Sequence, residues 1–561
     1  MKTIHQLPQQ VISKIAAGEV IERPAYAVKE LIENAIDAKA EYITINIEEA
    51  GLKKISVTDN GIGMNKEDLL ECFRPHTTSK ISTEEELTRI QSLGFRGEAL
   101  ASISAISNLT IKSKTNHEAE GIEVKIKSGT SEKISPIGIP LGTTVLIENL
   151  FHTVPVRKKF LKSQATEFRH IVEIVIQYAL AFPDIRFFLT HNKRIILDLS
   201  KNQTLIDRIK LLLGKDLFEE LIPISRQTSY LKINGYLSKP QLTATTLSKQ
   251  FIFVNNRRVH DRFISGAVKE AYGYLLEQNS YPIFILFFTI PFERVDVNIH
   301  PRKDQVNFAD RKTFIEEIRK EIRETLEQQN IIYNKKLLYS PKSGFTHSFA
   351  GKLLKDSITP WGIKTEKINS NAPVEQLHNL YLVTQSSKGM VMIDQHAAHE
   401  RILFEQFRKE FGEKKQLFSA YELPRSETLE LSITDKELIN EHEKILKKLG
   451  IRIDHFQGNS YIISSIPQFL KDRDIKTYIR ELLDTFSEEK NVTEIDRQTK
   501  KMLAYLACRS AIKAGEKLTK QQMKDLIKKL EETKNNETCP HGRPTKIIVS
   551  LLDLNKLFKR N

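Results

Sequence analysis

Cysteine is scarce in this chain of 561 residues, because only Cys72, Cys508 and Cys539 occur. Three cysteines are too few for a disulfide framework, and scarce free thiols fit a reducing cytoplasm. Long apolar runs are also missing. The most apolar segment, residues 283–290, is too short to cross a bilayer, and the N-terminus lacks the apolar core of a signal peptide. We therefore expect a cytoplasmic protein without a membrane role.

Acidic residues are fewer than basic ones. The sequence contains 71 Asp and Glu against 85 Lys and Arg, which gives a formal net charge of +14 and a pI near 9.3. This excess favours an anionic partner, and nucleic acid is the commonest one for a basic intracellular protein. A chain of this length also exceeds what one hydrophobic core usually supports, so we expect several domains.

Hydrophobic patterning divides the chain into three parts. Residues 1 to about 330 alternate helical patterns with short β-branched runs, which predicts an α+β fold. Residues 331–373 are rich in lysine and turn-forming residues and predict a flexible basic tether. The rest begins with a predicted hairpin, then a helix from about 396 and a helical region to about 530. Among the predicted strands are residues 42–47, 54–57, 144–147, 380–384 and 390–393.

The strongest local signal is a cluster of potential metal ligands and acid/base groups between Asp394 and Glu405. An apolar run ends at Asp394, and the following pattern predicts a helix on which His396 and Glu400 share one face. A carboxylate at a strand end beside such a face is a common way to build a metal site. The alternative is that these groups form the solvated face of an amphipathic helix. Their order does not match the His-Glu-x-x-His pattern of metallopeptidases.

A second cluster favours the metal site over a solvated face. Cys539 and His541 stand two residues apart in Cys-Pro-His-Gly-Arg-Pro, a segment stiffened by its prolines. A thiolate and an imidazole together with carboxylates favour zinc or a similar divalent ion.

Three weaker motifs occur near the N-terminus. Residues 30–38 are helical by composition and place Glu30 and Asn34 on one face, so that a carboxylate base lies beside an amide oxygen. Residues 59–63, Asp-Asn-Gly-Ile-Gly, predict a turn that lets backbone approach a ligand, although such a pattern alone is more often a plain turn. Residues 94–100 predict a glycine loop leading into a helix, which is an anion site. The chain has no Gly-x-x-x-x-Gly-Lys-Ser/Thr P-loop.

In this order and spacing, the three motifs resemble the GHKL nucleotide-binding fold of type II topoisomerases, heat-shock chaperones of the ninety-kilodalton class, histidine kinases and MutL proteins. Four segments narrow the resemblance to the MutL mismatch-repair family: residues 15–24, 30–38, 74–80 and 94–100. The resemblance extends through residues 295–303 and covers nearly the whole chain apart from the tether. It implies an α+β protein with four parts. These are a GHKL (Bergerat) ATPase domain over 1–210, a second α/β domain with a crossover helix over 211–330, the flexible linker 331–373, and a C-terminal α/β dimerisation and endonuclease domain over 374–561.

The resemblance implies an ATP-hydrolysing switch that uses magnesium. Glu30 would be the general base that activates the attacking water, and Asn34 would give an oxygen ligand to Mg²⁺. Asp59 would accept the adenine amino proton. Residues 94–100 would form a lid that closes over the phosphates and is released on hydrolysis. The other implied ATP-binding residues are Gly61, Gly63, Thr78, Gly94, Arg96, Gly97, Glu98, Ala99, Leu100, Thr143 and, from the second domain, Lys303.

Basic residues supply candidate DNA contacts, because guanidinium and ammonium groups suit phosphate. Residues 153–159, Thr-Val-Pro-Val-Arg-Lys-Lys, lose the asparagine of the family's Asn-Thr-Pro-Ala-Arg but keep its proline and basic run. A second group follows the strand-like residues 251–254, and its alternative is a solvated surface. The candidates are Arg157, Lys158, Lys159, Arg257, Arg258 and Arg262.

In its C-terminal part, the chain resembles the MutL proteins that nick DNA. It matches every fixed position of Asp-Gln-His-Ala-x-x-Glu-x-x-x-x-Glu at residues 394–405, and residues 507–513, 539–544 and 558–560 resemble further family segments. Bound zinc or manganese would turn water into a nucleophile for a phosphodiester. The implied ligands are His396, Glu400, Cys539, His541 and, nearby, Cys508; Asp394 would be a ligand or, like Glu400, a catalytic group.

Three neighbouring side chains receive other roles. On a continuous helix Glu405 lies opposite His396, so we expect Glu405 to support the site or to be structural. His399 occupies a variable position of the motif and is predicted to lie on the surface. Arg543 would steer the scissile phosphate.

The implied partners are DNA, a mismatch-recognition protein and a second copy of the chain, as a homodimer through the C-terminal domains. The family's clamp-docking pattern Gln-x-x-Leu/Ile-x-Pro is degenerate at residues 419–424, so we expect docking on a sliding clamp to be weak or absent. The main alternative function is an ATP-dependent matchmaker with a structural zinc and no nuclease activity. A topoisomerase-like ATPase subunit fits less well, because the C-terminal half and the lack of a cleavage-tyrosine context argue against it.

Overall fold

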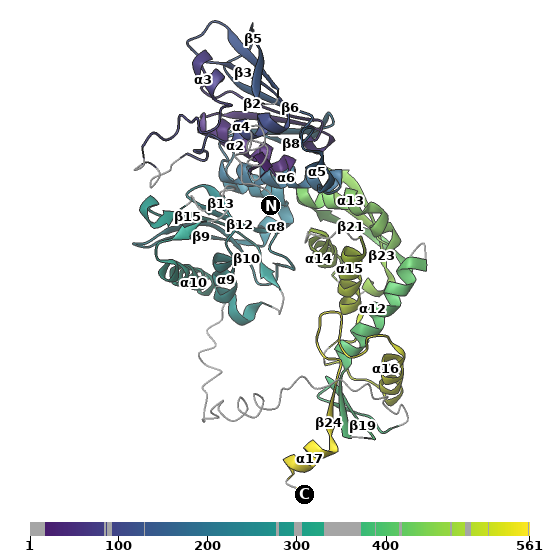
Figure 1. Ribbon diagram of the computed structural model, residues 1–561. Coiled ribbons are helices and arrows are strands. Elements are labelled where there is room, and N and C mark those ends of the chain that lie inside the picture. Colours follow the sequence, from purple (N-terminus) through teal and green to yellow (C-terminus); the bar gives the residue numbers. More distant parts are fainter. Residues whose placement is uncertain are drawn as a thin grey trace, which may run out of the picture. The chain divides into compact units, whose positions relative to one another are not determined.

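A computed structural model of the chain describes two compact units (Figure 1). One comprises Met1–Tyr333, Thr428–Glu443 and His455–Ile462, and the other Asn334–Glu427, Lys444–Asp454 and Ile463–Asn561. Lys303 and most of the predicted tether lie outside the described residues. The described residues are 17–18, 20–83, 86, 92–127, 129–276, 280–296, 306–329, 372–387, 389–413, 418–471, 474–487, 495–513, 515–558 and 560.

The first unit contains an eight-stranded sheet with the order β5-β4-β3-β6-β2-β1-β7-β8. Only β1 and β7 are parallel among these neighbours. Ile43, Ile45 and Ile47 alternate along β1 and are buried, as a sheet with one covered face requires. The predicted strands 42–47, 54–57 and 144–147 lie within β1, β2 and β6. The strands are β1 (Tyr42–Glu48), β2 (Lys54–Asp59), β3 (Asn108–Lys114), β4 (Gly121–Lys127), β5 (Thr130–Ile137), β6 (Gly142–Glu148), β7 (Arg186–His191) and β8 (Arg194–Leu199).

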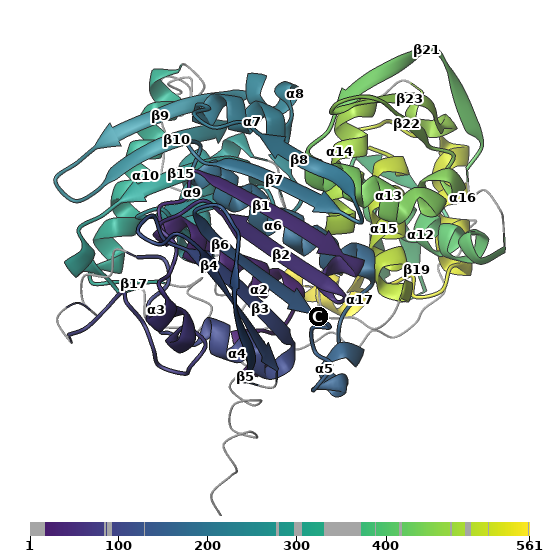
Figure 2. The same ribbon diagram turned by 90° about the horizontal axis from the view of Figure 1, so that it is seen from above.

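Helices α2 (Pro24–Asp37), α4 (Ala99–Ile106) and α6 (Gln164–Ala181) cover one face of this sheet, as Figure 2 shows. Pro24 opens α2, where its missing N–H costs no helical hydrogen bond. The apolar face of α2 is buried in the same core as the sheet. This packing holds α2 in place, and with it the polar residues that the helix carries. Smaller elements of the region are η1 (Glu49–Gly51), α3 (Lys66–Glu71), α5 (Pro155–Lys159), α7 (Leu205–Leu213) and α8 (Lys215–Glu219).

A second sheet of the same unit has the order β13-β12-β15-β10-β9. β12 and β15 are parallel, and the chain passes between them through α9, which is the expected crossover helix. The most apolar run of the sequence forms β15, and α9 and α10 pack on the same core. The elements are β9 (Leu221–Gln227), β10 (Lys232–Ser238), β12 (Gln250–Val254), β13 (Arg257–Val259), α9 (Arg262–Tyr272), β15 (Phe284–Thr289) and α10 (Arg311–Gln328), with short pieces β11 (Thr243–Ala244), η3 (Gly273–Leu275), β14 (Tyr281–Pro282), η4 (Phe292–Arg294), β16 (Val295–Asp296) and β17 (Asn307–Phe308).

The second unit contains a four-stranded antiparallel sheet with the order β18-β19-β20-β24. The predicted hairpin 380–393 corresponds to β19 and β20, and the predicted helix begins at Gln395. Residues of α12 and α16 share a buried core with the sheet. The elements are β18 (Glu375–Leu377), β19 (Tyr381–Ser386), β20 (Gly389–Asp394), α12 (Gln395–Glu413), α14 (Ile475–Ser487), α15 (Ile495–Ser510), α16 (Lys520–Glu532), β24 (Lys546–Ser550) and α17 (Leu551–Leu557).

The prediction of a helical region to about 530 is wrong in part. Between α12 and α14 the structure has a three-stranded sheet with the order β21-β23-β22. Its outer strands are mostly exposed and polar, so they show little hydrophobic alternation. Among the described residues, no helix has the length and apolar character needed to span a membrane. The elements are β21 (Ala420–Glu430), α13 (Ile433–Lys448), β22 (Arg452–Gln457), β23 (Ser460–Pro467) and η6 (Gln468–Leu470).

Candidate functional site

A pocket of about 1190 Å³ lies beside helix α2 in the first unit. Its walls come from α2, the turn after β2, residues 77–81, the loop 92–100 and β6. Pockets of this size hold small molecules and cofactors. The structure thus brings most of the predicted ATP-binding residues together. Those that line the pocket are Glu30, Asn34, Asp59, Gly63, Thr78, Gly94, Arg96, Gly97, Glu98, Ala99, Leu100 and Thr143.

Glu30 lines the pocket and is only 8% exposed. Lys29 Nζ lies 3.4 Å from Glu30 Oε1 and 2.9 Å from Glu33 Oε1. Burial opposes the charge of Lys29, but the two glutamates hold its pKa above the ordinary value. Glu33 also accepts a hydrogen bond of 2.5 Å from the Tyr178 hydroxyl. A buried lysine therefore lies between two carboxylates, of which only that of Glu30 belongs to the pocket wall.

Asp59 ends β2 and lines another part of the pocket. Its Oδ1 accepts a 2.8 Å hydrogen bond from the Gly61 N–H, so Gly61 orients the carboxylate although it does not line the pocket. Burial raises the pKa of Asp59 to about 6, against the hydrogen bonds from Gly61 and Thr143. At Gly63, φ is +72° and a Cβ would lie 2.1 Å from the Lys114 carbonyl oxygen. A side chain therefore does not fit at that turn.

Asp37 and Lys80 complete the pocket, although neither was a predicted site residue. Both Asp37 carboxylate oxygens accept backbone hydrogen bonds, from Leu93 N at 2.8 Å and Gly94 N at 2.9 Å. Lys80 Nζ lies 2.5 Å from Asp37 Oδ2 and 3.0 Å from Asn34 Oδ1. The available signal was that both residues fall inside the motifs 30–38 and 74–80. The start of the predicted lid is thus hydrogen-bonded to Asp37 of α2, the helix that also carries Glu30.

Two of the predicted DNA contacts are wrong in this structure. The Arg257 side chain is buried and donates to two backbone carbonyls, and Arg258 donates to three. Burial lowers the pKa of Arg258 to about 9. These guanidinium groups are therefore used inside the protein. Arg157 is partly buried and donates Nη1 to backbone carbonyls, whereas the other candidates are exposed; their contacts with DNA stay predictions. The exposed candidates are Lys158, Lys159 and Arg262.

In the second unit, the predicted metal cluster begins at the junction of β20 and α12. Asp394 Oδ1 accepts a 2.9 Å hydrogen bond from Ala397 N, so its carboxylate caps the start of α12. His396 Nδ1 lies 2.9 Å from the Ile512 carbonyl oxygen. Because a carbonyl can only accept, Nδ1 carries a hydrogen, and in the neutral imidazole the lone pair is then on Nε2. That lone pair is the one a metal would use.

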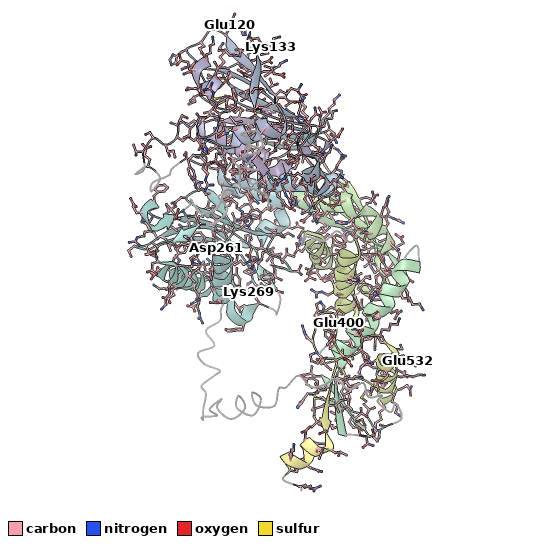
Figure 3. The ribbon with its side chains drawn as sticks, in the orientation of Figure 1. Glu120, Lys133, Asp261, Lys269, Glu400 and Glu532 are labelled. Carbon is pink, nitrogen blue, oxygen red and sulfur yellow. The ribbon has the colours of Figure 1, made fainter. Side chains whose placement is uncertain are left out.

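Glu400 lies on α12 (Figure 3) and is buried. Two groups of three potential ligands share this residue. Within each group all ligand atoms lie within 4.8 Å of one another. One group contains His396, Glu400 and Cys508, and the other contains Glu400, Cys539 and His541. The five residues come from α12, α15 and the loop before β24, and their thiol, imidazole and carboxylate groups fit a zinc-type site. The structure therefore joins the clusters that the sequence shows far apart.

The loop carrying Cys539 is folded tightly around its sulfur. His541 N donates to Cys539 Sγ at 3.4 Å, and Gly542 N donates to the Cys539 carbonyl at 3.0 Å. Cys539 N donates in turn to the Arg543 carbonyl at 2.8 Å. These bonds hold the sulfur of Cys539, a ligand type that zinc binds, in a fixed place within the loop. The Arg543 side chain is exposed beside this loop.

The charges within the cluster are strongly coupled. Hydrogen bonds to Cys539 and Glu400 raise the pKa of His541 to about 9, and its Nδ1 lies 2.8 Å from Glu400 Oε1. Burial opposes the charge of Glu400, but His541 holds the pKa of that carboxyl below its usual value. Burial, followed by the charge of Glu400, raises the pKa of Cys508 to about 12. A divalent cation would reverse these preferences by replacing the thiol and imidazolium protons.

Glu405 and His399 lie outside both ligand groups. Glu405 Oε1 is 3.0 Å from Arg401 Nη1, and Arg401 Nε donates at 2.6 Å to the carbonyl of Thr538, which precedes Cys539. Glu405 therefore supports the loop that carries a ligand. The prediction that His399 lies on the surface is wrong. It is partly buried, its Nδ1 accepts from Ile512 N at 3.0 Å, and burial lowers its pKa to about 4.

Three family models match successive parts of the chain. Residues 22–143 match the histidine kinase-, DNA gyrase B- and HSP90-like ATPase family, 209–327 the C-terminal domain of DNA mismatch repair proteins, and 374–518 the MutL C-terminal dimerisation domain. The chain is 33% identical to DNA mismatch repair protein MutL of Pelodictyon phaeoclathratiforme, with all of both chains covered. It belongs to the MutL family of DNA mismatch repair proteins. MutL of Syntrophotalea carbinolica is 32% identical, with 99% of each chain covered.

This MutL-family chain thus has a GHKL ATPase domain that binds ATP and a C-terminal dimerisation domain, which confirms the expected fold class and family. A solved N-terminal domain of a DNA repair protein is also similar. It has a TM-score of 0.51 and 26% identity, and the match covers 57% of this chain and 99% of that one.

Proposed function

We propose that this MutL-family protein is an ATP-driven switch that controls a metal-dependent DNA-nicking centre in its C-terminal domain. The nuclease proposal rests on one observation: the buried Glu400 and four further potential ligands come together from three separate segments. A capping carboxylate, Asp394, lies at the start of the helix that carries two of them. A matchmaker with a purely structural zinc is the alternative, and it would need no acid/base group near the metal.

In the ATPase domain, Glu30 would accept the proton of the attacking water, because its carboxylate lines the pocket and is shielded from solvent. Asn34 Oδ1 would be a ligand of magnesium, which prefers oxygen. Lys80 Nζ now lies against that same oxygen, so the two cations would compete for it and Lys80 would turn towards the phosphates. Asp59 would accept from the adenine amino group. Loop 94–100 would donate backbone N–H groups to phosphate oxygens.

In the C-terminal domain, His396, Glu400, Cys508, Cys539 and His541 would hold zinc or manganese. A divalent ion bound there lowers the pKa of water and so supplies hydroxide at neutral pH. The free oxygen of the Asp394 carboxylate would be a ligand or take a proton, while the other oxygen caps α12. The exposed Arg543 guanidinium would hold the scissile phosphate beside the ligands.

The remaining parts of the proposal concern organisation and partners. The dimerisation domain is consistent with a homodimer, and the formal net charge of +14 is consistent with DNA as a partner. A mismatch-recognition protein would supply the signal, and docking on a sliding clamp would be weak because the docking pattern is degenerate. We propose domain limits of 1–210, 211–330 and 374–561, with 331–373 as a linker.

Plasmid nicking tests the nuclease directly. Purified protein with Mn²⁺ is expected to convert supercoiled plasmid to the nicked circle, and Asp394→Asn to lower the nicking rate by about 100-fold or more, in the range of a lost acid/base group. Asparagine still caps a helix, so α12 should be retained. Asp310→Asn is the matched control, since Asp310 caps α10 in the same way, through the Thr313 N–H at 3.1 Å. If the wild type leaves the plasmid closed, or Asp394→Asn nicks as fast, the matchmaker function is favoured.

The proposed adenine contact predicts a pH dependence of nucleotide selection. The carboxyl of Asp59 has a pKa of about 6, so below that pH a proton must leave before the carboxylate can accept from the amino group. Preference for ATP over inosine triphosphate, which lacks that amino group, should therefore fall roughly tenfold between pH 7 and pH 5. Isothermal titration calorimetry of both nucleotides gives the ratio of their dissociation constants at each pH. Protonation of the triphosphate affects both nucleotides equally and cancels in this ratio. A selectivity that is constant over this range would contradict the role of Asp59.

A further inference from the structure

One buried arginine of the second sheet contacts the ATPase pocket. Arg257 begins β13 at the edge of that sheet, and only 5% of the residue is exposed. Its Nη1 donates to the Leu93 carbonyl at 3.2 Å, and its Nη2 donates to the Ser92 carbonyl. Ser92 lines the pocket, and both residues immediately precede Gly94, the first residue of the predicted phosphate-binding loop 94–100. The guanidinium therefore holds the backbone of residues 92–93, which we call the loop root.

The same root is held from its other side by α2. Leu93 N and Gly94 N donate to the two oxygens of Asp37, at 2.8 and 2.9 Å. Consecutive peptide units thus have their carbonyls on Arg257 and their N–H groups on Asp37. Hydrogen bonds from both sides fix the position and the orientation of these peptide units, because a rotated peptide would lose its bonds to Arg257 and to Asp37.

The positive charge of Arg257 is stabilised by acidic side chains of α2. Burial lowers the pKa of Arg257, and the charges of Glu33, Tyr178, Asp37 and Glu30 counteract that effect, in this order. An arginine buried among acidic groups is costly to separate from them, because the remaining charges would be left unpaired. Any movement of the second sheet relative to α2 would therefore act on the loop root and on the acidic side chains of α2.

The neighbouring Arg258 is held without any bond to residues 92–93, so a guanidinium in this strand does not need the contact that Arg257 makes. Its guanidinium donates at 2.8 Å to the Gln250 carbonyl, at 3.3 Å to the Ile252 carbonyl and also to the Val259 carbonyl, all within β12 and β13. Two adjacent arginines therefore have different tasks. Arg258 stabilises its own hairpin, whereas Arg257 reaches the ATPase pocket.

We propose that Arg257 is a positioning residue for ATP hydrolysis, through which the second sheet sets the position of the phosphate-binding loop 94–100. The inference rests on the proposed role of that loop. When the second sheet is in place, the guanidinium holds residues 92–93 so that the following N–H groups can reach the phosphates. When the sheet shifts, the loop root loses its carbonyl partners and the loop opens. The contact would transmit changes in both directions, because a closed loop also favours the sheet position that satisfies Arg257.

The test compares Arg257→Gln and Arg257→Lys with Arg258→Gln and Arg258→Lys in the full-length protein. Arg257→Gln is expected to lower kcat for ATP by about 10- to 100-fold, because a displaced loop of about 1 Å can cost that much. KM should change less, since the proposed adenine contact at Asp59 is untouched. Arg257→Lys, which keeps the charge and one donor, should recover part of kcat. The Arg258 variants should lower Tm and leave kcat of the folded protein unchanged.

A second measurement reads the loop itself. Hydrogen exchange of the amides in 94–100 should slow when the non-hydrolysable analogue AMPPNP is added to the wild type and to the Arg258 variants, but not to Arg257→Gln. Wild-type kcat and loop protection in a folded Arg257→Gln protein would overturn the proposal. Equal losses of kcat in the Arg257 and Arg258 variants, in proportion to Tm, would overturn it too. Glu30→Gln distinguishes failure of the proposed ATPase site from failure of the Arg257 inference. If Glu30→Gln abolishes turnover while Arg257→Gln does not lower it, the ATPase site is supported and the role of Arg257 is wrong.

Discussion

Glu30→Gln is expected to lower the turnover of ATP by about 10²- to 10⁴-fold, the usual contribution of a general base. The carboxylate lines the pocket and is 8% exposed, so glutamine keeps its volume and removes only its ability to take a proton. Binding of ATP should stay within a few-fold of wild type, since the contacts to adenine and to the phosphates come from other segments. Single-turnover hydrolysis and equilibrium binding of a fluorescent nucleotide measure the two effects separately.

Glu33→Gln is the matched control for this prediction. Glu33 lies one turn along α2, is equally buried and contacts the same Lys29, but it does not line the pocket. Its loss should lower thermal stability, because Tyr178 and Lys29 lose their charged partner. Turnover should change far less than in Glu30→Gln. Comparable losses of turnover in the two variants would assign the effect to the charge of α2 and not to a base.

Cys539→Ser is expected to remove the metal from the C-terminal domain and to abolish metal-dependent nicking. Loss of an outer-shell partner alone weakens metal binding by roughly 10- to 100-fold, so loss of a buried thiolate ligand should exceed about 100-fold. ATP turnover should be unchanged, because the ATPase pocket contains none of the five ligand candidates. Elemental analysis of the dialysed protein gives the metal content, and a plasmid assay gives nicking.

Cys72→Ser tests whether any cysteine change would have the same effect. Cys72 is a partly buried thiol in the wall of the ATPase pocket, outside both ligand groups. Its Sγ donates to the Leu69 carbonyl at 3.3 Å, and burial raises its pKa to about 12. This variant should keep its metal and its nicking activity. Full metal content in Cys539→Ser would instead exclude Cys539 as a ligand, whatever happens to nicking.

Sequence patterning predicted the elements that carry both sites because these elements bury one regular face. The alternating isoleucines of β1 and the four-residue spacing of His396 and Glu400 are local features, and the structure keeps both. Patterning failed for β21 and β22, because these exposed polar strands have no strong alternation. It also failed for His399, because the position of the Ile512 backbone, which buries and bonds that ring, is set by distant segments.

The basic residues show the same limit. Arg257 and Arg258 have the composition of a DNA-binding surface, yet both guanidinium groups are bonded to backbone carbonyls. Arginine can either bind an external phosphate or satisfy buried carbonyls, and only the surroundings decide which. Asp37 and Lys80 are the reverse case: ordinary residues within matched motifs become part of the pocket because the loop root folds against α2.

The chemical groups of this MutL-family chain can be read from its residues: an acid and an amide on one helical face, glycine loops for phosphate, and thiol, imidazole and carboxylate groups suited to a metal. These follow from residue types and short spacings. The tertiary structure alone decided which groups meet. It places Cys508, Cys539 and His541 around Glu400, and it places the Arg257 side chain against the backbone of residues 92–93 and not on a DNA-binding surface. Such contacts join residues more than a hundred positions apart, and only the packing of the cores fixes them.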